Sequence, residues 1–122
     1  TVPYNFINKN PFNSMYFAVQ AMAAELSTGT LVFLHLDQSK MSVIVTGLKA
    51  EYLKKAKSKI TFVCKDGNKI VDTINQASKS YDSFSCSMTA SGFDSNNDCV
   101  SNFEITCKGR PTYFLLRVVL VR

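Results

Sequence analysis

The stretch NPFNSMYFAVQAMAAELSTG (residues 10–29) carries the strongest structural pattern in the chain. Asn10 is a residue type that caps helices, and Pro11 suits a first helical turn. Apolar residues then recur at helical spacing, at Phe12, Met15, Tyr16, Val19, Met22, Ala23 and Leu26. Gly29 stands where a helix commonly ends. The pattern predicts one helix over about residues 11–27, with one apolar face packed against another layer.

After Gly29 most of the chain has the composition of β-strands. The candidate strands are rich in β-branched and aromatic residues, and they cover residues 30–36, 41–47, 59–64, 69–74, 83–90, 102–107 and 112–122. The dipeptide Asp66-Gly67 predicts a hairpin turn. Residues 48–58 fit either a short helix or a continued strand. The sequence therefore predicts an α+β fold in a single domain, residues 1–122, with one N-terminal helix packed on an antiparallel β-sheet.

The composition bears on which kinds of site the chain can hold. It has 122 residues, a formal net charge of +5, one histidine and no tryptophan. A single histidine, His35, excludes zinc sites built on several imidazoles. The five glycines are scattered at positions 29, 47, 67, 92 and 109, so no glycine-rich phosphate loop is present. Because nothing is specific for catalysis, the sequence predicts a non-enzyme with no cofactor and no metal.

The number and spacing of the cysteines predict where in or outside the cell the protein works. Four cysteines stand at Cys64, Cys86, Cys99 and Cys107, without a Cys-x-x-Cys motif. An even number in a small basic chain favours two disulfide bonds and hence a secreted, extracellular protein. Sequential pairing would join residues 64 and 86 and residues 99 and 107, and the other two pairings stay open. The alternative is four buried thiols in a cytosolic domain. No apolar run reaches the roughly 20 residues of a membrane span.

Lysines gather in the middle of the chain. The segment LKKAKS (residues 53–58) matches a loose heparin-binding pattern, and sulfated-glycan contacts are predicted at Lys54, Lys55, Lys57 and Lys59. The alternative is a solvated lysine face that keeps the protein soluble. Nucleic acid is not predicted as a partner, because arginines number only three and no aromatic residues alternate with the lysines.

Several motifs resemble the cystatins and their cathelin and latexin relatives. The helix text MYFAVQAMAAELSTG (residues 15–29) is similar to the cystatin helix. VIVTG (residues 43–47) looks like the Gln-x-Val-x-Gly hairpin of that family, with Val43 in place of the glutamine and with Val45 and Gly47 matching. GRPTYF (residues 109–114) takes the place of the second hairpin, where Pro111 fits and the usual tryptophan is missing.

The resemblance implies a cystatin-like fold and a recognition role. Because the glutamine and the tryptophan are missing, it favours a secreted non-enzymatic protein that binds another protein through surface loops. The contact residues implied are Val43, Val45, Gly47, Pro111 and Tyr113. The alternative is an inhibitor of papain-type cysteine proteases, and a further alternative is the sulfated-glycan binder.

Overall fold

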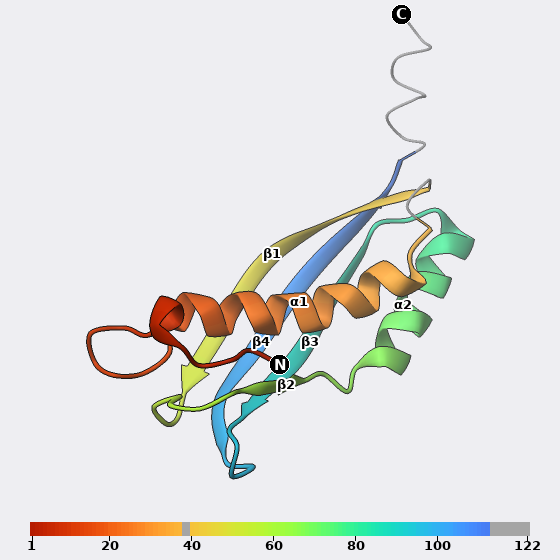
Figure 1. Ribbon diagram of the computed structural model, residues 1–122. Coiled ribbons are helices and arrows are strands. Elements are labelled where there is room, and N and C mark those ends of the chain that lie inside the picture. The colour runs from red at the N-terminus through yellow and green to blue at the C-terminus, as the bar shows by residue number, and fades with distance from the viewer. Residues whose placement is uncertain (38–39, 113–122) are drawn as a thin grey trace, which may run out of the picture.

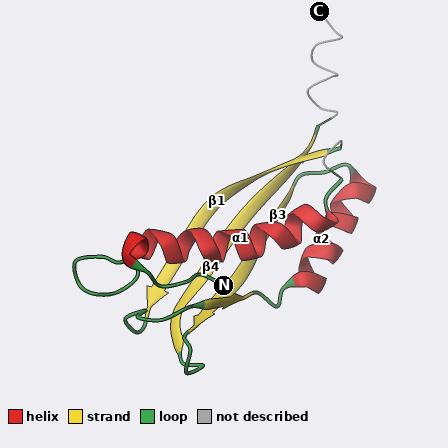
Figure 2. Ribbon diagram, in the orientation of Figure 1, coloured by secondary structure: helices red, strands yellow, loops and turns green. Residues whose placement is uncertain are grey.

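The computed structural model describes residues 1–37 and 40–112. Its elements are η1 (Phe6–Asn8), α1 (Phe17–His35), β1 (Met41–Tyr52), β2 (Thr61–Val63), α2 (Gly67–Ser80), β3 (Phe84–Phe93) and β4 (Cys99–Pro111). The strands form one antiparallel sheet in the order β1-β4-β3-β2. Figure 1 shows α1 lying across one face of this sheet, with α2 beside its C-terminal half. The predicted α+β class, a helix packed on an antiparallel sheet, is confirmed (Figure 2).

The two faces of the sheet differ in polarity along its central strands. On β3 the buried side chains are Phe84, Cys86, Met88 and Ala90, and the polar side chains between them lie on the other face. On β4 the residues Phe103, Ile105 and Cys107 join the same core. This alternation is why the strand predictions over residues 83–90 and 102–107 are correct.

The first helix differs from its prediction at both ends. It begins at Phe17 and runs to His35, so the strand predicted over residues 30–36 is wrong. Those residues are apolar on both faces, and such a pattern fits a strand and a helix equally. Gly29 lies within the helix and has no positive φ. Thr28 and Val32 continue the buried helical face onto the sheet.

A second helix replaces the predicted hairpin around Asp66-Gly67. Ile70, Ile74 and Ala77 are its buried residues, at helical spacing. The carboxylate of Asp66 accepts hydrogen bonds from the backbone N–H of Thr89, at 2.6 Å, and from its hydroxyl, at 3.0 Å. These bonds hold the start of α2 against β3, so Asp66 is a helix anchor rather than a turn residue.

The motif predicted as a cystatin hairpin lies inside a long strand. Val43, Val45 and Gly47 pair with β4 along β1, and a β-bulge between Val45 and Gly47 shifts the register. No loop apex forms there, and Pro111 closes β4 opposite Met41. Tyr113, with residues 113–122 of the last predicted strand, lies outside the described residues. The hairpin geometry implied by the resemblance is therefore absent from β1 and β4.

The predicted disulfide bonds are not formed. All four cysteines are free thiols. Cys99 and Cys107 lie on the same extended strand, eight residues apart, which corresponds to about 26 Å. A disulfide requires Cα atoms within about 7 Å, so these two cannot pair. Cys107 instead lies directly opposite Cys86 on β3, and both are buried. The disulfide prediction is wrong, while the secreted location stays a prediction.

Candidate active site

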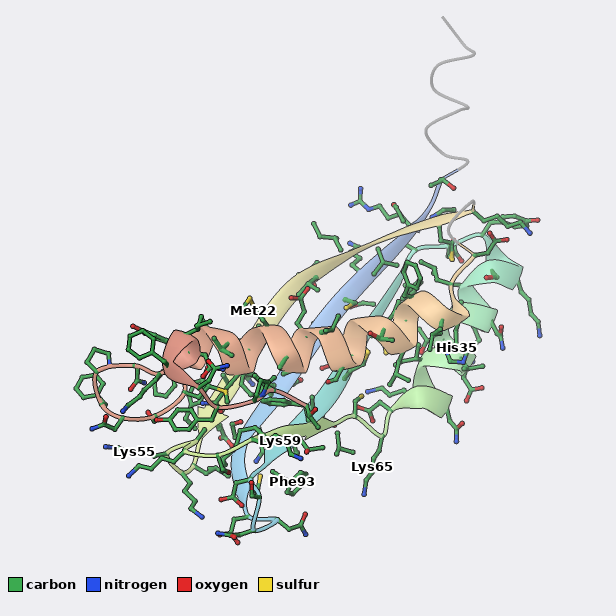
Figure 3. All side chains as sticks on the ribbon, in the orientation of Figure 1. Met22, His35, Lys55, Lys59, Lys65 and Phe93 are labelled. Atoms are coloured by element: carbon green, nitrogen blue, oxygen red, sulfur yellow. The ribbon has the colours of Figure 1, made fainter. Side chains whose placement is uncertain are left out.

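The face of α1 turned away from the sheet is apolar and open. Met22, Leu26 and Phe33 are 61%, 71% and 62% exposed. Their spacing places them on one side of the helix, and Figure 3 shows Met22 projecting from the side of α1 nearer to β1. Glu25 lies in this stripe and is the single carboxylate in the 19 residues of α1. An isolated carboxylate in such an apolar surface is a candidate catalytic base.

An apolar groove of about 430 Å³ lies between α1 and β1. It is lined by Gly29, Val32, Phe33, Leu36, Met41, Ser42, Val43, Val45 and Cys107. Gly29 is one helical turn beyond Glu25, on the same side of α1, so Glu25 lies on the helical turn just before the groove. Burial raises the pKa of the Cys107 thiol, and the nearby thiol of Cys86 and the charge of Glu25 raise it further.

A second cavity, of about 600 Å³, opens at the beginning of α1. Three segments line it: residues of the loop before α1, the first turn of α1, and the chain that follows β1. The lining residues are Asn10, Pro11, Phe12, Ser14, Tyr16, Phe17, Ala18, Tyr52, Leu53, Lys54, Lys55 and Ala56. The cavity therefore lies where a helix N-terminus meets the end of the edge strand.

The loop before α1 is shaped by the side chain of Asn10, which does not cap the helix as predicted. Its Oδ1 accepts from the backbone N–H groups of Phe12, at 2.9 Å, and Ser14, at 3.2 Å. Its amide nitrogen donates to the Ser14 hydroxyl at 3.1 Å. The N–H of Met15 donates to the carbonyl of Ala56 at 2.8 Å. These bonds fix the loop to the chain after β1 and hold the cavity wall in place.

The start of α1 leaves backbone donors free. Tyr16 is the N-cap residue, and no side chain caps the helix. The N–H groups of Val19 and Gln20 donate to the Tyr16 carbonyl, whereas those of Phe17 and Ala18 have no acceptor among residues 1–37 and 40–112. Free amides at the positive end of a helix dipole attract negative charge. This end of the cavity can therefore stabilise an oxyanion.

The predicted glycan-binding lysines do not act as one cluster. The Lys54 ammonium contacts the carboxylates of Asp94, at 3.0 Å, and Asp98, at 2.6 Å. The hydrogen bonds that the Lys54 ammonium donates to the carboxylates of Asp98 and Asp94 raise the pKa of Lys54. The backbone N–H of Asp98 and the side chain of Lys54 lower the pKa of Asp94. Lys54 is therefore neutralised, whereas Lys55, Lys57 and Lys59 are exposed without a carboxylate partner among the described residues.

Sequence reasoning missed Glu25 and the free amides at the start of α1. The available signal was a lone carboxylate inside the predicted helix over residues 11–27. The one histidine does not join the site, because His35 Nδ1 lies 2.8 Å from the carbonyl of Leu31 on the exposed end of the same helix. Within residues 1–37 and 40–112 no group of three or more His, Cys, Asp or Glu side chains could hold a metal ion.

Comparison with known proteins gives one family match. Residues 1–108 match the model of the family described as a domain of unknown function, DUF4442. No curated protein sequence matches the chain.

Solved structures share the fold at low sequence identity. A probable thioesterase from Pseudomonas aeruginosa is 22% identical with a TM-score of 0.78, and the match covers 89% of this chain and 72% of that one. A Bacillus halodurans protein solved with CoA is 13% identical with a TM-score of 0.65, covering 88% and 63%. A mutant thioesterase, also from Pseudomonas aeruginosa, is 13% identical with a TM-score of 0.70, covering 89% and 70%.

These matches correct the predicted function as well as the fold family. The fold is that of thioesterase-like hotdog proteins and not that of the cystatins. The prediction of a non-enzyme came from the composition, and the predicted protein-binding or protease-inhibiting role came from the cystatin resemblance; both are wrong, because the structural neighbours are thioesterases. The predicted protein and sulfated-glycan partners are likewise overturned, since one neighbour of this fold was solved with CoA, a small molecule.

Proposed function

Because this chain belongs to the DUF4442 family, we propose that it is a hotdog-fold thioesterase that hydrolyses acyl-CoA thioesters. The observation that carries the proposal is the position of Glu25, the one carboxylate of α1, on the helical turn just before an apolar groove. In the reaction, water attacks the thioester carbonyl carbon, the carbon–sulfur bond breaks, and a carboxylic acid and the CoA thiol are released.

The groove between α1 and β1 suits an acyl chain. Its lining is almost entirely aliphatic or aromatic, and the backbone at Gly29 leaves space where any other residue would place a side chain. Each methylene of an acyl chain that enters such a groove gains about 0.8 kcal/mol from leaving water. The groove therefore favours substrates with an aliphatic tail and places the thioester at its Glu25 end.

Glu25 acts as the general base. Its carboxylate takes a proton from the attacking water, and the protonated acid returns that proton to the departing thiolate. Apolar neighbours around Glu25 exclude bulk water once the groove is filled, which strengthens the electrostatic interactions of the reacting groups.

The oxyanion is stabilised by the amides at the start of α1. Ala18 and Glu25 are seven residues apart, which is about 10 Å along one helix, so a single chain cannot direct both groups at one carbonyl. An antiparallel second copy packed on the apolar stripe places the amide of Ala18 opposite Glu25 of the partner helix. The exposed side chains of Met22 and Leu26 would be buried at the crossing, which supports this arrangement.

The experiment is release of CoA thiol from a series of straight-chain acyl-CoA substrates, from acetyl to palmitoyl, measured with a thiol reagent on the purified protein. We expect turnover to rise with chain length until the groove is filled and then to level off. Spontaneous hydrolysis without protein gives the background. No release above that background for any chain length, by protein whose circular dichroism shows it folded, would overturn the proposal.

A further inference from the structure

Large apolar side chains project from the end of the molecule that holds the start of α1. Phe6 and Ile7, on η1, are 92% and 88% exposed, and Phe12 is 74% exposed. Leu53, the residue that follows β1, is 58% exposed. Side chains of this size in water are unfavourable unless something covers them, and several together mark an interaction surface.

The segments that carry these side chains lie next to each other. Val2 and Ile60 exchange backbone hydrogen bonds of 2.8 and 2.9 Å. The Lys55 ammonium donates to the Phe12 carbonyl at 3.4 Å. In Figure 3, Lys55 and Lys59 lie along the side of the molecule where the chain after β1 runs beside the N-terminal segment. The apolar side chains and the lysines therefore belong to one region of the surface.

This region carries a net positive charge. Residues 1–16 and 53–63 contain no Asp or Glu. They contribute Lys9, Lys55, Lys57 and Lys59, which are exposed and form no ion pair with any described residue. Lys54 is the exception, because Asp94 and Asp98 neutralise it. We call this region the basic-apolar surface: Phe6, Ile7, Phe12 and Leu53 with Lys9, Lys55, Lys57 and Lys59.

We propose that the basic-apolar surface docks on an anionic phospholipid bilayer. The four apolar side chains enter the headgroup boundary, and the lysines contact lipid phosphates, as in other peripheral proteins that combine both features. A second copy of this chain is a poor occupant, because a two-fold contact would bring the unpaired lysines of both copies together, while the nearby carboxylates of Asp94 and Asp98 are already paired with Lys54. Phe12, Leu53 and Lys55 also line the 600 Å³ cavity, so docking would bring the mouth of that cavity to the lipid.

This proposal does not depend on hydrolysis, and its test measures binding alone. The full chain is sedimented with vesicles of phosphatidylcholine containing one third phosphatidylserine, and with vesicles of phosphatidylcholine only. We expect binding to the anionic vesicles that weakens with salt, and little binding to the neutral ones. Absence of binding to the anionic vesicles at low salt would overturn the proposal.

Two matched variants show whether vesicle binding depends on this particular surface or only on the net positive charge of the protein. Replacing Lys55, Lys57 and Lys59 with Gln is expected to weaken binding about five-fold per lysine. The control, Lys65→Gln with Lys79→Gln and Lys108→Gln, removes the same charge from exposed positions elsewhere and should weaken binding much less. Equal losses in the two variants would mean attraction by net charge alone and would overturn the proposal.

The apolar contribution is tested by Phe6→Ser with Ile7→Ser. Both side chains are almost fully exposed, so the fold should persist, and circular dichroism checks it. We expect at least a ten-fold loss of vesicle binding. If the double variant instead keeps its vesicle binding and changes the oligomeric state in size-exclusion chromatography, the surface joins protein copies and the proposal is wrong.

Discussion

The ring of Phe17 stacks on the ring of Tyr52, with 3.9 Å between the ring centroids and 17° between the ring planes. The contact joins the first residue of α1 to the last residue of β1, and the Tyr52 hydroxyl donates to the Phe17 carbonyl at 3.2 Å. Tyr52 also meets Phe103 edge to face, in the core of the sheet. The start of the helix, with its free amides, is therefore held in a fixed place on the sheet.

Tyr52→Ala should loosen this arrangement. Loss of the half-buried ring and its two aromatic contacts is expected to lower the free energy of unfolding by about 2–3 kcal/mol. Tyr52→Phe keeps both ring contacts and loses only the hydroxyl, so its cost should be about 1 kcal/mol or less. Urea denaturation of both variants measures the difference, and equal losses would show that the ring stacking contributes little.

Leu26→Asp should separate two copies of the chain. Leu26 lies in the apolar stripe beside Glu25 and is exposed, so the single chain should keep its fold while a charge enters the proposed contact between helices. We expect a shift to monomer in size-exclusion chromatography and loss of hydrolysis. Leu34→Asp is the control, since Leu34 is 69% exposed on another side of α1. An active Leu26→Asp monomer would disprove the two-copy site.

Gly29→Leu should change the preferred acyl chain. The added side chain would project toward the groove, where the backbone of Gly29 now leaves space. We expect kcat/KM to fall for long acyl-CoA substrates by at least about ten-fold and to change little for short ones. Thr30→Leu, exposed at the next position, should leave the chain-length profile unchanged. Equal loss for all chain lengths would argue against an acyl chain in this groove.

The partly buried thiol of Cys64 and the buried thiol of Cys107 predict that the stability of the fold depends on pH in the alkaline range. Burial raises the pKa of Cys64 and of Cys107 above the value of an unfolded thiol, about 8.5. Above that pH the unfolded chain loses thiol protons that the folded chain keeps, so the free energy of unfolding should fall as the pH rises through this range. Urea denaturation between pH 7 and pH 10 measures it. The double variant Cys64→Ser and Cys107→Ser should show a smaller decline, and an unchanged decline would refute the assignment.

The sequence predicts correctly those strands that bury one face and expose the other to solvent. Cys86 and Met88 alternate with serines on β3, and this period of two identifies a strand without tertiary information. β1 was harder to delimit, because it lies at the edge of the sheet and exposes most of its residues. Its continuation through Leu48 to Tyr52 depends on pairing with β4, a contact distant in sequence.

The end of α1 and the whole of α2 were predicted wrongly, because the local sequence pattern fits strands as well as helices. Residues 30–36 are apolar on every side, so only packing of α1 along the sheet decides that they are helical. In α2 the spacing of Ile70, Ile74 and Ala77 was a helical signal, but the Asp66-Gly67 dipeptide favoured a hairpin. The candidate site could not be predicted for a similar reason. The groove beside Glu25 forms only when α1 packs next to β1, and the sequence alone does not show that contact.

The role of Glu25 as the base of an acyl-CoA thioesterase is tested by measuring kcat for Glu25→Gln beside Glu51→Gln. Both residues are exposed carboxylates, and neither substitution should disturb folding. We expect Glu25→Gln to lose at least about 100-fold in kcat on a long-chain acyl-CoA, with KM little changed, and Glu51→Gln to keep wild-type turnover. Hydrolysis by Glu25→Gln at the wild-type rate would contradict that role.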